Sequence, residues 1–404
     1  MKMFDDKFFA SNRQRVAAKL DGGILLITAH DSLQSVADMA YPFRQESNFY
    51  YLTGLDSPRW KAVYDSKRDY CWLVRPHYSQ TERLFDGVLD DETALSTSGA
   101  NQVIDETEFE SLLRQLARKH ASVFGLAAQK SSQYSFYLNP APARMYGQLE
   151  RNFAKVIDVR KLLAQVRALK QPSEIKLIEK AVDITASAFA EAKQQAGSMK
   201  SEYELEAVFT YLFRRANTSH AYEPIVASGG NALLLHYGAN NQRFARSNMV
   251  LCDIGAQYNH YAADITRMIA LKPPTKRQHA VYLALLEAQQ AIIADIETDM
   301  PVELYQQMTD KHMHSALIKL GLMTNDWDEN LYSKYFPHAV SHGLGLDVHD
   351  SLGGTRTLRE SMVLTVEPGI YIEQEGIGMR IEDDILIGQK AARNLSASIS
   401  TSLD

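Results

Sequence analysis

Residues 249–270, MVLCDIGAQYNHYAADITRMIA, decide how this chain folds, because apolar side chains recur at every second position along most of the stretch. A period of two is typical of a β-strand with alternating faces. The pattern predicts one strand at Met249–Gln257 and a second at His260–Ala270, joined by a two-residue turn at Tyr258-Asn259. The stretch is therefore expected to form an antiparallel hairpin.

Two aspartates interrupt these otherwise apolar strands. A turn at the predicted position places Asp253 directly opposite Asp264 on one face of the hairpin, about 5 Å apart at Cβ. Two carboxylates that close repel each other in an apolar setting unless a cation or a proton lies between them. The alternative is that each aspartate caps a turn or pairs with a base such as Arg267. The pair is a candidate metal site.

A second pair of strands repeats this arrangement near the end of the chain. The segments LTVEPGIYI (364–372) and MRIEDDILI (379–387) each carry carboxylates among apolar residues. A hairpin centred on Gln374-Glu375 places Glu367 opposite Glu382. The same device, two strands with facing acids, is thus predicted twice.

Alternation along the last of these strands sorts its charged residues by face. Arg380, Glu382 and Asp384 share one face, so a local salt bridge is the alternative interpretation of Glu382. Asp383 lies on the other face. We therefore expect Asp383→Ala to cost far less than Asp264→Ala.

Three of the chain's twelve histidines lie within residues 338–349, HAVSHGLGLDVH. The glycines in this segment argue against a long helix, and so against a helical zinc site with histidines four residues apart. Histidines that are merely hydrogen-bonded in a loop are the alternative. Four buried carboxylates carry a charge of about −4, which two divalent cations would neutralise. Oxygen-rich ligation favours Mn²⁺ or Co²⁺, with Zn²⁺ as a further option, and such a site suits a hydrolase.

The composition predicts an ordinary soluble globular protein. The 404 residues are 45% hydrophobic and 23% charged, and the net charge is −6, which gives no reason to expect nucleic acid or an anionic membrane as a partner. No apolar run approaches transmembrane length, and no signal-peptide core is present. Cys71 and Cys252 are expected to be reduced, buried thiols in different domains. Together these features predict a cytoplasmic protein.

Two domains are predicted, divided where the sequence pattern changes at Asp158. Residues 1–157 are predicted to form a smaller α/β domain with two buried strands and an amphipathic helix, at 23–28, 70–74 and 108–120. Residues 158–404 alternate helices with antiparallel strands, which predicts an α+β domain with a central sheet and a possible internal duplication. The catalytic residues are expected in this second domain.

The order of the candidate metal ligands along the chain resembles that of a known protein family. In their order along the chain, five of these residues resemble the metal ligands of the pita-bread metallopeptidases: Asp253, Asp264, His342, Glu367 and Glu382. That family includes methionine aminopeptidase, prolidase and aminopeptidase P. The phrases SHGLGLDVHD, LTVEPGIYI and RIEDD carry the likeness over residues 158–404. YPFRQESNFYYLTG (41–54) and the ending RNLSAS (393–398) are similar to aminopeptidase P in particular.

This resemblance implies a role for each ligand. Asp253 would chelate one metal ion, and Asp264 and Glu382 would bridge both ions. His342 and Glu367 would complete the shell of the second ion. Glu367 would also carry the proton from the nucleophilic water to the leaving nitrogen.

The resemblance also implies residues that face the substrate. His236 and His349 would steady the scissile carbonyl as it becomes tetrahedral and so take part in catalysis. His338, Tyr371 and Arg380 would contribute to substrate binding, with His338 and Arg380 also supporting the ligands.

The implied activity is that of an Xaa-Pro aminopeptidase, which removes an N-terminal residue that precedes proline. The implied partners are peptides with proline in second position and further copies of the chain, as a dimer or tetramer, and two Mn²⁺ ions are the leading cofactor. A prolidase restricted to dipeptides is the rival, and Arg356 is near the position of its carboxylate-binding arginine. A metal-free binding protein or creatinase-like hydrolase is disfavoured, because all five ligands are present.

Overall fold

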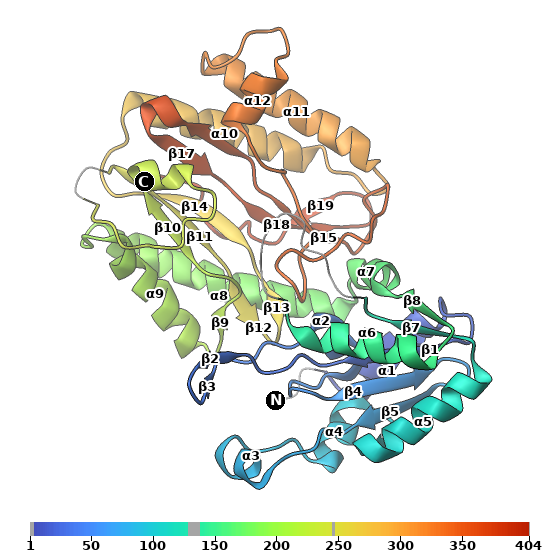
Figure 1. The fold of residues 1–404 in the computed structure, drawn as a ribbon. Coiled ribbons are helices and arrows are strands. Elements are labelled where there is room, and N and C mark those ends of the chain that lie inside the picture. Colours follow the sequence, from blue (N-terminus) through green and yellow to red (C-terminus); the bar gives the residue numbers. More distant parts are fainter. Residues whose placement is uncertain (1–3, 128–137, 245–246, 404) are drawn as a thin grey trace. The chain divides into compact units, whose positions relative to one another are not determined.

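The computed structural model describes residues 4–127, 138–244 and 247–403, and the chain forms two compact units, Met1–Val166 and Arg167–Asp404 (Figure 1). The division falls after Val166 rather than after residue 157. Strand β8 (Lys155–Asp158) is the edge strand of the first unit's sheet, and helix α7 (Arg160–Ala168) follows it almost directly. The change of sequence pattern at Asp158 therefore marks the end of the sheet, and the compact unit extends into α7.

The first unit is built on a mixed six-stranded sheet in the order β6-β5-β4-β1-β7-β8. Its other strands are β1 (Ile24–Thr28), β4 (Lys61–Asp65), β5 (Tyr70–Val74), β6 (Gln102–Ile104) and β7 (Ser122–Gly125), with a separate hairpin of β2 (Gln34–Val36) and β3 (Met39–Ala40). Its helices are α1 (Asp6–Ala17), α2 (Ser47–Thr53), α3 (Gln80–Phe85), α4 (Asp91–Ser98), α5 (Glu106–Lys119) and α6 (Pro140–Asn152). The predicted α/β character, both predicted strands and the predicted helix are confirmed within two residues of their expected ends.

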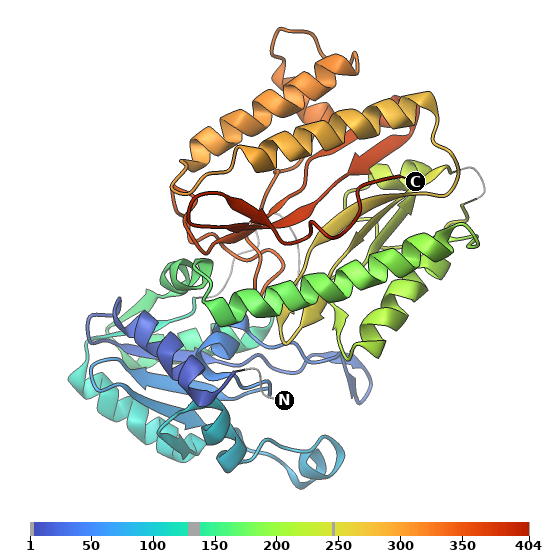
Figure 2. The ribbon, with the colours of Figure 1, turned by 180° about the vertical axis from the view of Figure 1, so that it is seen from behind.

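The core of this unit lies between the sheet and helices α5 and α6, which cover one face while α1 lies on the other (Figures 1 and 2). Ile24 and Leu26 of β1 pack with Phe109 and Leu113 of α5 and Leu149 of α6, and all five are buried. Apolar residues three and four apart on α5 give the helix one apolar side, which explains why the sequence pattern identified it.

The second unit contains two long helix pairs and short antiparallel sheets. Its helices are α8 (Pro172–Ala196), α9 (Glu202–Arg215), α10 (Lys276–Ala294), α11 (Val302–Lys319) and α12 (Glu329–Tyr335), with 3₁₀ turns η1 (Gly229–Leu233) and η2 (Glu373–Glu375). Its strands are β9 (Ser219–His220), β10 (Ile225–Ser228), β11 (Met249–Ile254), β12 (Ala256–Tyr258), β13 (Tyr261–Ala262), β14 (Ile265–Ala270), β15 (Val363–Val366), β16 (Gly369–Ile372), β17 (Ile377–Arg380), β18 (Asp383–Ile387) and β19 (Ala392–Asn394).

The helix pairs flank the strands of this unit (Figure 1). Helix α8 packs against β12, β13 and β14, whereas α10 packs against β15, β16, β17 and β19. Each helix pair is thus followed in sequence by antiparallel strands, as the predicted α+β domain requires. Within the described ranges, no helix has both the length and the apolar character that a bilayer crossing requires. Cys71 and Cys252 are free, buried and in different units, as predicted.

The hairpin of residues 249–270 forms, but it turns one residue later than predicted. Tyr258 pairs with Tyr261, so the two-residue turn is Asn259-His260. Both turn residues have positive φ, 46° and 70°. A type I′ hairpin turn requires positive φ at both central positions, and asparagine tolerates it well. The asparagine, rather than the tyrosine before it, begins the turn.

This correction moves the two aspartates along the hairpin. Asp253 pairs with Thr266, so the prediction that it lies directly opposite Asp264 is wrong. In the same register Asp264 is level with Gly255. A Cβ atom at position 255 would lie 1.8 Å from the Ala263 carbonyl oxygen, so this position requires glycine. Moving the turn by one residue shifts the pairing by two positions, which preserves the alternation of side chains. Both aspartates therefore keep the shared face that the sequence predicts.

The register predicted for the second hairpin is confirmed. Gly369 pairs with Arg380 in β16–β17, and Val366 pairs with Asp383 in β15–β18. Glu367 and Glu382 occupy the short breaks between these strand pairs, at levels that this register makes opposite. The second pair of acids thus faces each other where the sheet is interrupted.

Candidate metal centre

The structure brings all five predicted ligands together, with His349 beside them. Their ligand atoms form three overlapping groups, within each of which they lie no more than 4.8 Å apart: Asp253, Asp264 and Glu382; His342, Glu367 and Glu382; and Asp264, His342 and His349. Residues more than a hundred positions apart in sequence thus converge near the strand breaks that hold Asp264, Glu367 and Glu382.

His342 is oriented as a ligand would be. Its Nδ1 lies 3.0 Å from the carbonyl oxygen of Gly343, which can only accept, so Nδ1 carries a proton. Its Nε2 faces the cluster, 3.4 Å from Asp264 Oδ2 and 3.4 Å from Glu367 Oε1. Burial opposes protonation, but the hydrogen bond to Asp264 and the charges of both acids raise the pKa of His342 to about 9.

Burial raises the pKa of three of the clustered carboxyl groups, because it disfavours their charged forms. Burial raises the pKa of Glu367 to about 7, with the charge of Asp264 adding to the effect and His342 opposing it. Burial, with smaller contributions from neighbouring acids, also raises the pKa of Asp264 and of Glu382, although His342 lowers that of Asp264. The acids of this cluster outnumber the positive charges of His342 and Arg380, and its oxygen-rich donors with one imidazole suit divalent cations. The residues present therefore fit a divalent metal centre.

Asp253 is fixed from two sides. Its Oδ1 accepts a 2.5 Å hydrogen bond from the Tyr222 hydroxyl, and its Oδ2 accepts one of 2.5 Å from Arg380 Nη2. The suggested partner Arg267 does not pair with Asp253. Sequence patterns give no signal for Tyr222, because it lies in the connection between β9 and β10 and approaches Asp253 only in the folded chain.

Glu382 is oriented by a threonine that the sequence pattern does not single out. Thr266, which pairs with Asp253 across the hairpin, donates a 2.8 Å hydrogen bond to Glu382 Oε2. The same hydroxyl accepts from Arg380 Nε at 3.2 Å. The ion pair that Arg380 makes is with Asp253, so the local salt bridge considered for Glu382 gives way to this threonine bridge.

The predicted substrate-binding residues His338, Tyr371 and Arg380 form a hydrogen-bonded chain. The Tyr371 hydroxyl accepts from Arg380 Nη1 at 2.9 Å and lies 3.0 Å from His338 Nε2. The carbonyl of Ala339 lies 2.9 Å from His338 Nδ1, so Nδ1 is the donor and Nε2 accepts from the tyrosine. Burial lowers the pKa of His338 to about 4, which keeps the ring neutral near pH 7. This chain runs from Asp253 to His338.

The two remaining predicted histidines are exposed. The ring centroid of His349 lies 4.3 Å from that of His342. Burial and the charges of His342 and His236 lower the pKa of His349. His236 follows η1 in the connection to β11. His349 is thus accessible beside the carboxylate cluster, and His236 is exposed on the connection that follows η1.

Two acids next to Glu382 have roles that the sequence did not reveal. Asp383 does face away from the cluster, as alternation predicts, but it is buried in a 2.5 Å ion pair with Arg267 and accepts a 2.7 Å hydrogen bond from Gln289. That Asp383→Ala costs far less metal binding and hydrolysis than Asp264→Ala stays a prediction, but the buried ion pair adds an expected loss of stability. Asp384 Oδ2 accepts a 3.2 Å hydrogen bond from the backbone N–H of Asp264, which ties the two hairpins together.

A buried ion cluster supports the loop that carries His342 and His349. Asp350 Oδ1 lies 3.0 Å from Arg167 Nη2, and its Oδ2 lies 3.5 Å from Lys170 Nζ. A side chain at position 345 would approach Asp350 Oδ2 to 2.3 Å, so Gly345 is needed for this packing. Neither base was identified from the sequence, because each lies about 180 residues from the loop.

The chain is similar to known proteins along most of its length. Residues 9–124 match the aminopeptidase P N-terminal domain. An Xaa-Pro aminopeptidase of Escherichia coli is 32% identical over 97% of this chain and 94% of that protein. An Xaa-Pro dipeptidase of Pyrococcus horikoshii is 36% identical, but over only 61% of this chain and 66% of that protein. The solved structure of E. coli aminopeptidase P with the inhibitor Pro-Leu superposes with a TM-score of 0.87 at 30% identity, covering 99% of this chain and 97% of that one.

The region that holds the carboxylate cluster has its own match. Residues 176–389, which contain every predicted ligand, match the model of metallopeptidase family M24. The α+β fold and the α/β N-terminal unit predicted from the sequence are those of the matched structure. With four carboxylates and one imidazole converging in a matching fold, the chain belongs to metallopeptidase family M24.

Proposed function

We propose that this chain is an Xaa-Pro aminopeptidase that uses two Mn²⁺ ions. The observation that carries the proposal is the convergence of five ligands in the second unit of a chain whose first unit matches the aminopeptidase P N-terminal domain. A prolidase is less well supported, because the dipeptidase match covers a smaller part of the chain. Assembly into a dimer or tetramer and a cytoplasmic location stay predictions from the sequence.

The two cations would be held by the residues that cluster at the strand breaks. Asp253 would bind one ion, His342 and Glu367 the other, and Asp264 and Glu382 both. When bound, the ions supply Lewis acidity at the scissile carbonyl and lower the pKa of the attacking water. Mn²⁺ fits a donor set of hard oxygens with one nitrogen.

Side chains of this chain transfer the proton and bind the substrate. Glu367 takes the proton of the attacking water and returns it to the proline nitrogen, which must be protonated to leave. Glu367 suits this task because its side chain is 17% exposed, whereas that of Asp264 is only 7% exposed. His349, exposed beside the cluster, and His236, exposed on its loop, donate to the carbonyl oxygen as it becomes negative. His338, Tyr371 and Arg380 bind the substrate and hold Asp253 in place.

Replacing His349 tests the separation between metal binding and catalysis. We expect His349→Ala to keep its metal content and to lower kcat by about 10²-fold or more, as for the loss of an oxyanion donor. Metal analysis and steady-state kinetics on an Xaa-Pro peptide measure both quantities. His349 lies close enough to Asp264 and His342 to be a ligand, so loss of metal in this variant would reassign it as one.

Substrate length distinguishes the aminopeptidase from the prolidase. We expect cleavage of Xaa-Pro-Yaa tripeptides at least as fast as of Xaa-Pro dipeptides, with activity in both cases dependent on added Mn²⁺. The inhibitor Pro-Leu of the E. coli enzyme supports this, because Pro-Leu is what cleavage of an Xaa-Pro-Leu tripeptide releases. Arg356 is exposed, so Arg356→Ala should leave tripeptide hydrolysis within roughly tenfold. Dipeptide cleavage alone, abolished by Arg356→Ala, would identify a prolidase.

A further inference from the structure

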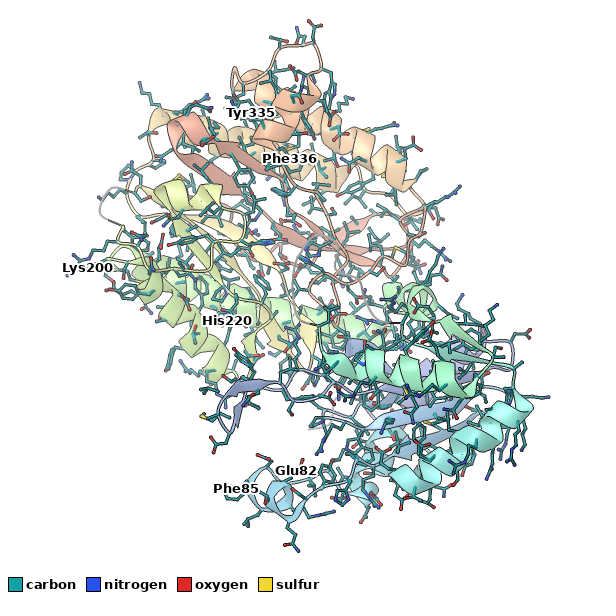
Figure 3. The ribbon with its side chains drawn as sticks, viewed as in Figure 1. Glu82, Phe85, Lys200, His220, Tyr335 and Phe336 are labelled. Atoms are coloured by element: carbon teal, nitrogen blue, oxygen red, sulfur yellow. The ribbon has the colours of Figure 1, made fainter. Side chains whose placement is uncertain are left out.

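The loop that presents His236 is built around one buried carboxylate. This loop, residues 228–242, leaves β10, forms the short turn η1 and then continues without a strand or an α-helix. His236 is exposed near its middle. Glu202, the first residue of α9, lies against the loop and is 0% exposed. Lys200, labelled in Figure 3, precedes this end of α9.

Five hydrogen bonds from the loop converge on the Glu202 carboxylate. One oxygen accepts from the backbone N–H of Ser228 at 2.8 Å, from its hydroxyl at 2.8 Å and from Asn231 Nδ2 at 2.9 Å. The other accepts from the Tyr237 hydroxyl at 2.8 Å and from the backbone N–H of Gln242 at 2.9 Å. All the donors belong to residues 228–242.

These donors lie on both sides of His236. Ser228 and Asn231 precede it, and Tyr237 follows it directly. Hydrogen bonds to an ionised acceptor are about twice as strong as neutral ones, and the N-terminus of a helix favours a negative charge. One carboxylate therefore fixes the loop before and after the histidine. Without that carboxylate, the five donors have no shared acceptor, and the loop loses the contact that sets its path.

We propose that Glu202 is a positioning residue for His236. The inference rests on the proposed function, in which His236 donates to the carbonyl oxygen of the substrate. Glu202 touches neither the substrate nor the metal ligands in this arrangement. It acts by holding the loop so that the imidazole lies at the edge of the cluster, where a misplacement of about 1 Å can cost roughly 10²-fold in rate.

A double-mutant cycle tests this inference. We expect His236→Ala to lower kcat/KM about 10²-fold and Glu202→Gln to lower it about tenfold, whereas in the His236→Ala background Glu202→Gln should add less than about twofold. Tyr237→Phe, which removes one of the five hydrogen bonds, serves as a second, milder variant if Glu202→Gln does not fold. Metal content should stay at the wild-type value throughout.

A matched control lies on the same helix. Glu204 accepts a 2.6 Å hydrogen bond from the backbone N–H of Lys200 and is not among the loop's partners, so Glu204→Gln should leave kcat/KM unchanged. Hydrogen exchange gives a readout besides activity. Residues 228–242 should exchange faster in Glu202→Gln and in Tyr237→Phe than in the wild-type chain, and residues of the long helix α8 should not.

The possible results separate the inference from the proposed function. Additive losses in the double variant, or unchanged exchange in residues 228–242, would overturn the positioning role while leaving the aminopeptidase intact. A His236→Ala variant with full activity on Xaa-Pro-Yaa peptides would do the same. A wild-type chain that cleaves no Xaa-Pro peptide would overturn the proposed function, and the exchange measurement would still decide whether Glu202 orders the loop.

Discussion

Replacing Asp264 with alanine is expected to abolish both metal binding and peptide hydrolysis. The Asp264 carboxylate belongs to two of the three ligand groups, so its loss removes a donor from both proposed ion positions at once. It also removes the acid that faces His342 Nε2 at 3.4 Å. Metal content per chain, measured by elemental analysis, should fall from about two ions to near zero. Hydrolysis of an Xaa-Pro-Yaa peptide should become undetectable.

The same variant should stay folded. Burial and the charge of Asp253 raise the pKa of Asp264, which means that the metal-free fold holds this carboxylate at a cost. Thermal unfolding of the metal-free variant should therefore occur at or above the temperature found for the metal-free wild type. Asp183→Ala, on the exposed side of α8, is the matched control and should keep metal and activity. Normal metal content in Asp264→Ala would remove Asp264 from the site.

The candidate ligands were predictable from the sequence because they break a strong pattern. A carboxylate within a buried strand is conspicuous, and alternation with a period of two assigns it to a face even when the turn is misplaced by a residue. That is why Asp253 and Asp264 converge although the predicted direct pairing is wrong. The second hairpin was predicted more accurately, since Glu367 and Glu382 are level with each other in the observed register.

The residues that support the ligands could not be predicted in this way. Tyr222 reaches the site from a connection with no periodic signal and Arg167 supports it from the end of α7, and each finds its partner only through the tertiary fold. Glu202 looks like an ordinary acid in the first turn of a helix, a position where negative charge is common. Its function as a loop anchor depends on five donors that lie 26 to 40 residues later in the chain. Local pattern carries no information about such contacts.

Asp383 shows where alternation misleads. Its position correctly indicates that the side chain points away from the metal centre, but facing away from a site is not the same as facing solvent. Arg267 donates to Asp383 Oδ1 at 2.5 Å and to the main-chain carbonyl of Glu382 at 2.6 Å. Gln289 of α10 donates to the other Asp383 oxygen at 2.7 Å. The ion pair of Arg267 and Asp383 thus joins α10 to β14 and β18, the strands that directly follow Asp264 and Glu382.

Replacing Asp383 with alanine is therefore expected to lower the free energy of unfolding by about 3–5 kcal/mol, because it leaves the Arg267 guanidinium buried without its counter-ion. Urea or guanidinium denaturation of the metal-free chain measures this loss. In the double variant Arg267→Met/Asp383→Leu, which removes both charges and keeps the volume, most of the lost stability should return. An Asp383→Ala variant as stable as wild type would show that the ion pair contributes nothing. Asp264 and Asp383 lie on opposite faces, so their replacements should be detected by different assays. Loss of Asp264 removes the metal and leaves the fold, whereas loss of Asp383 weakens the fold on which metal binding depends.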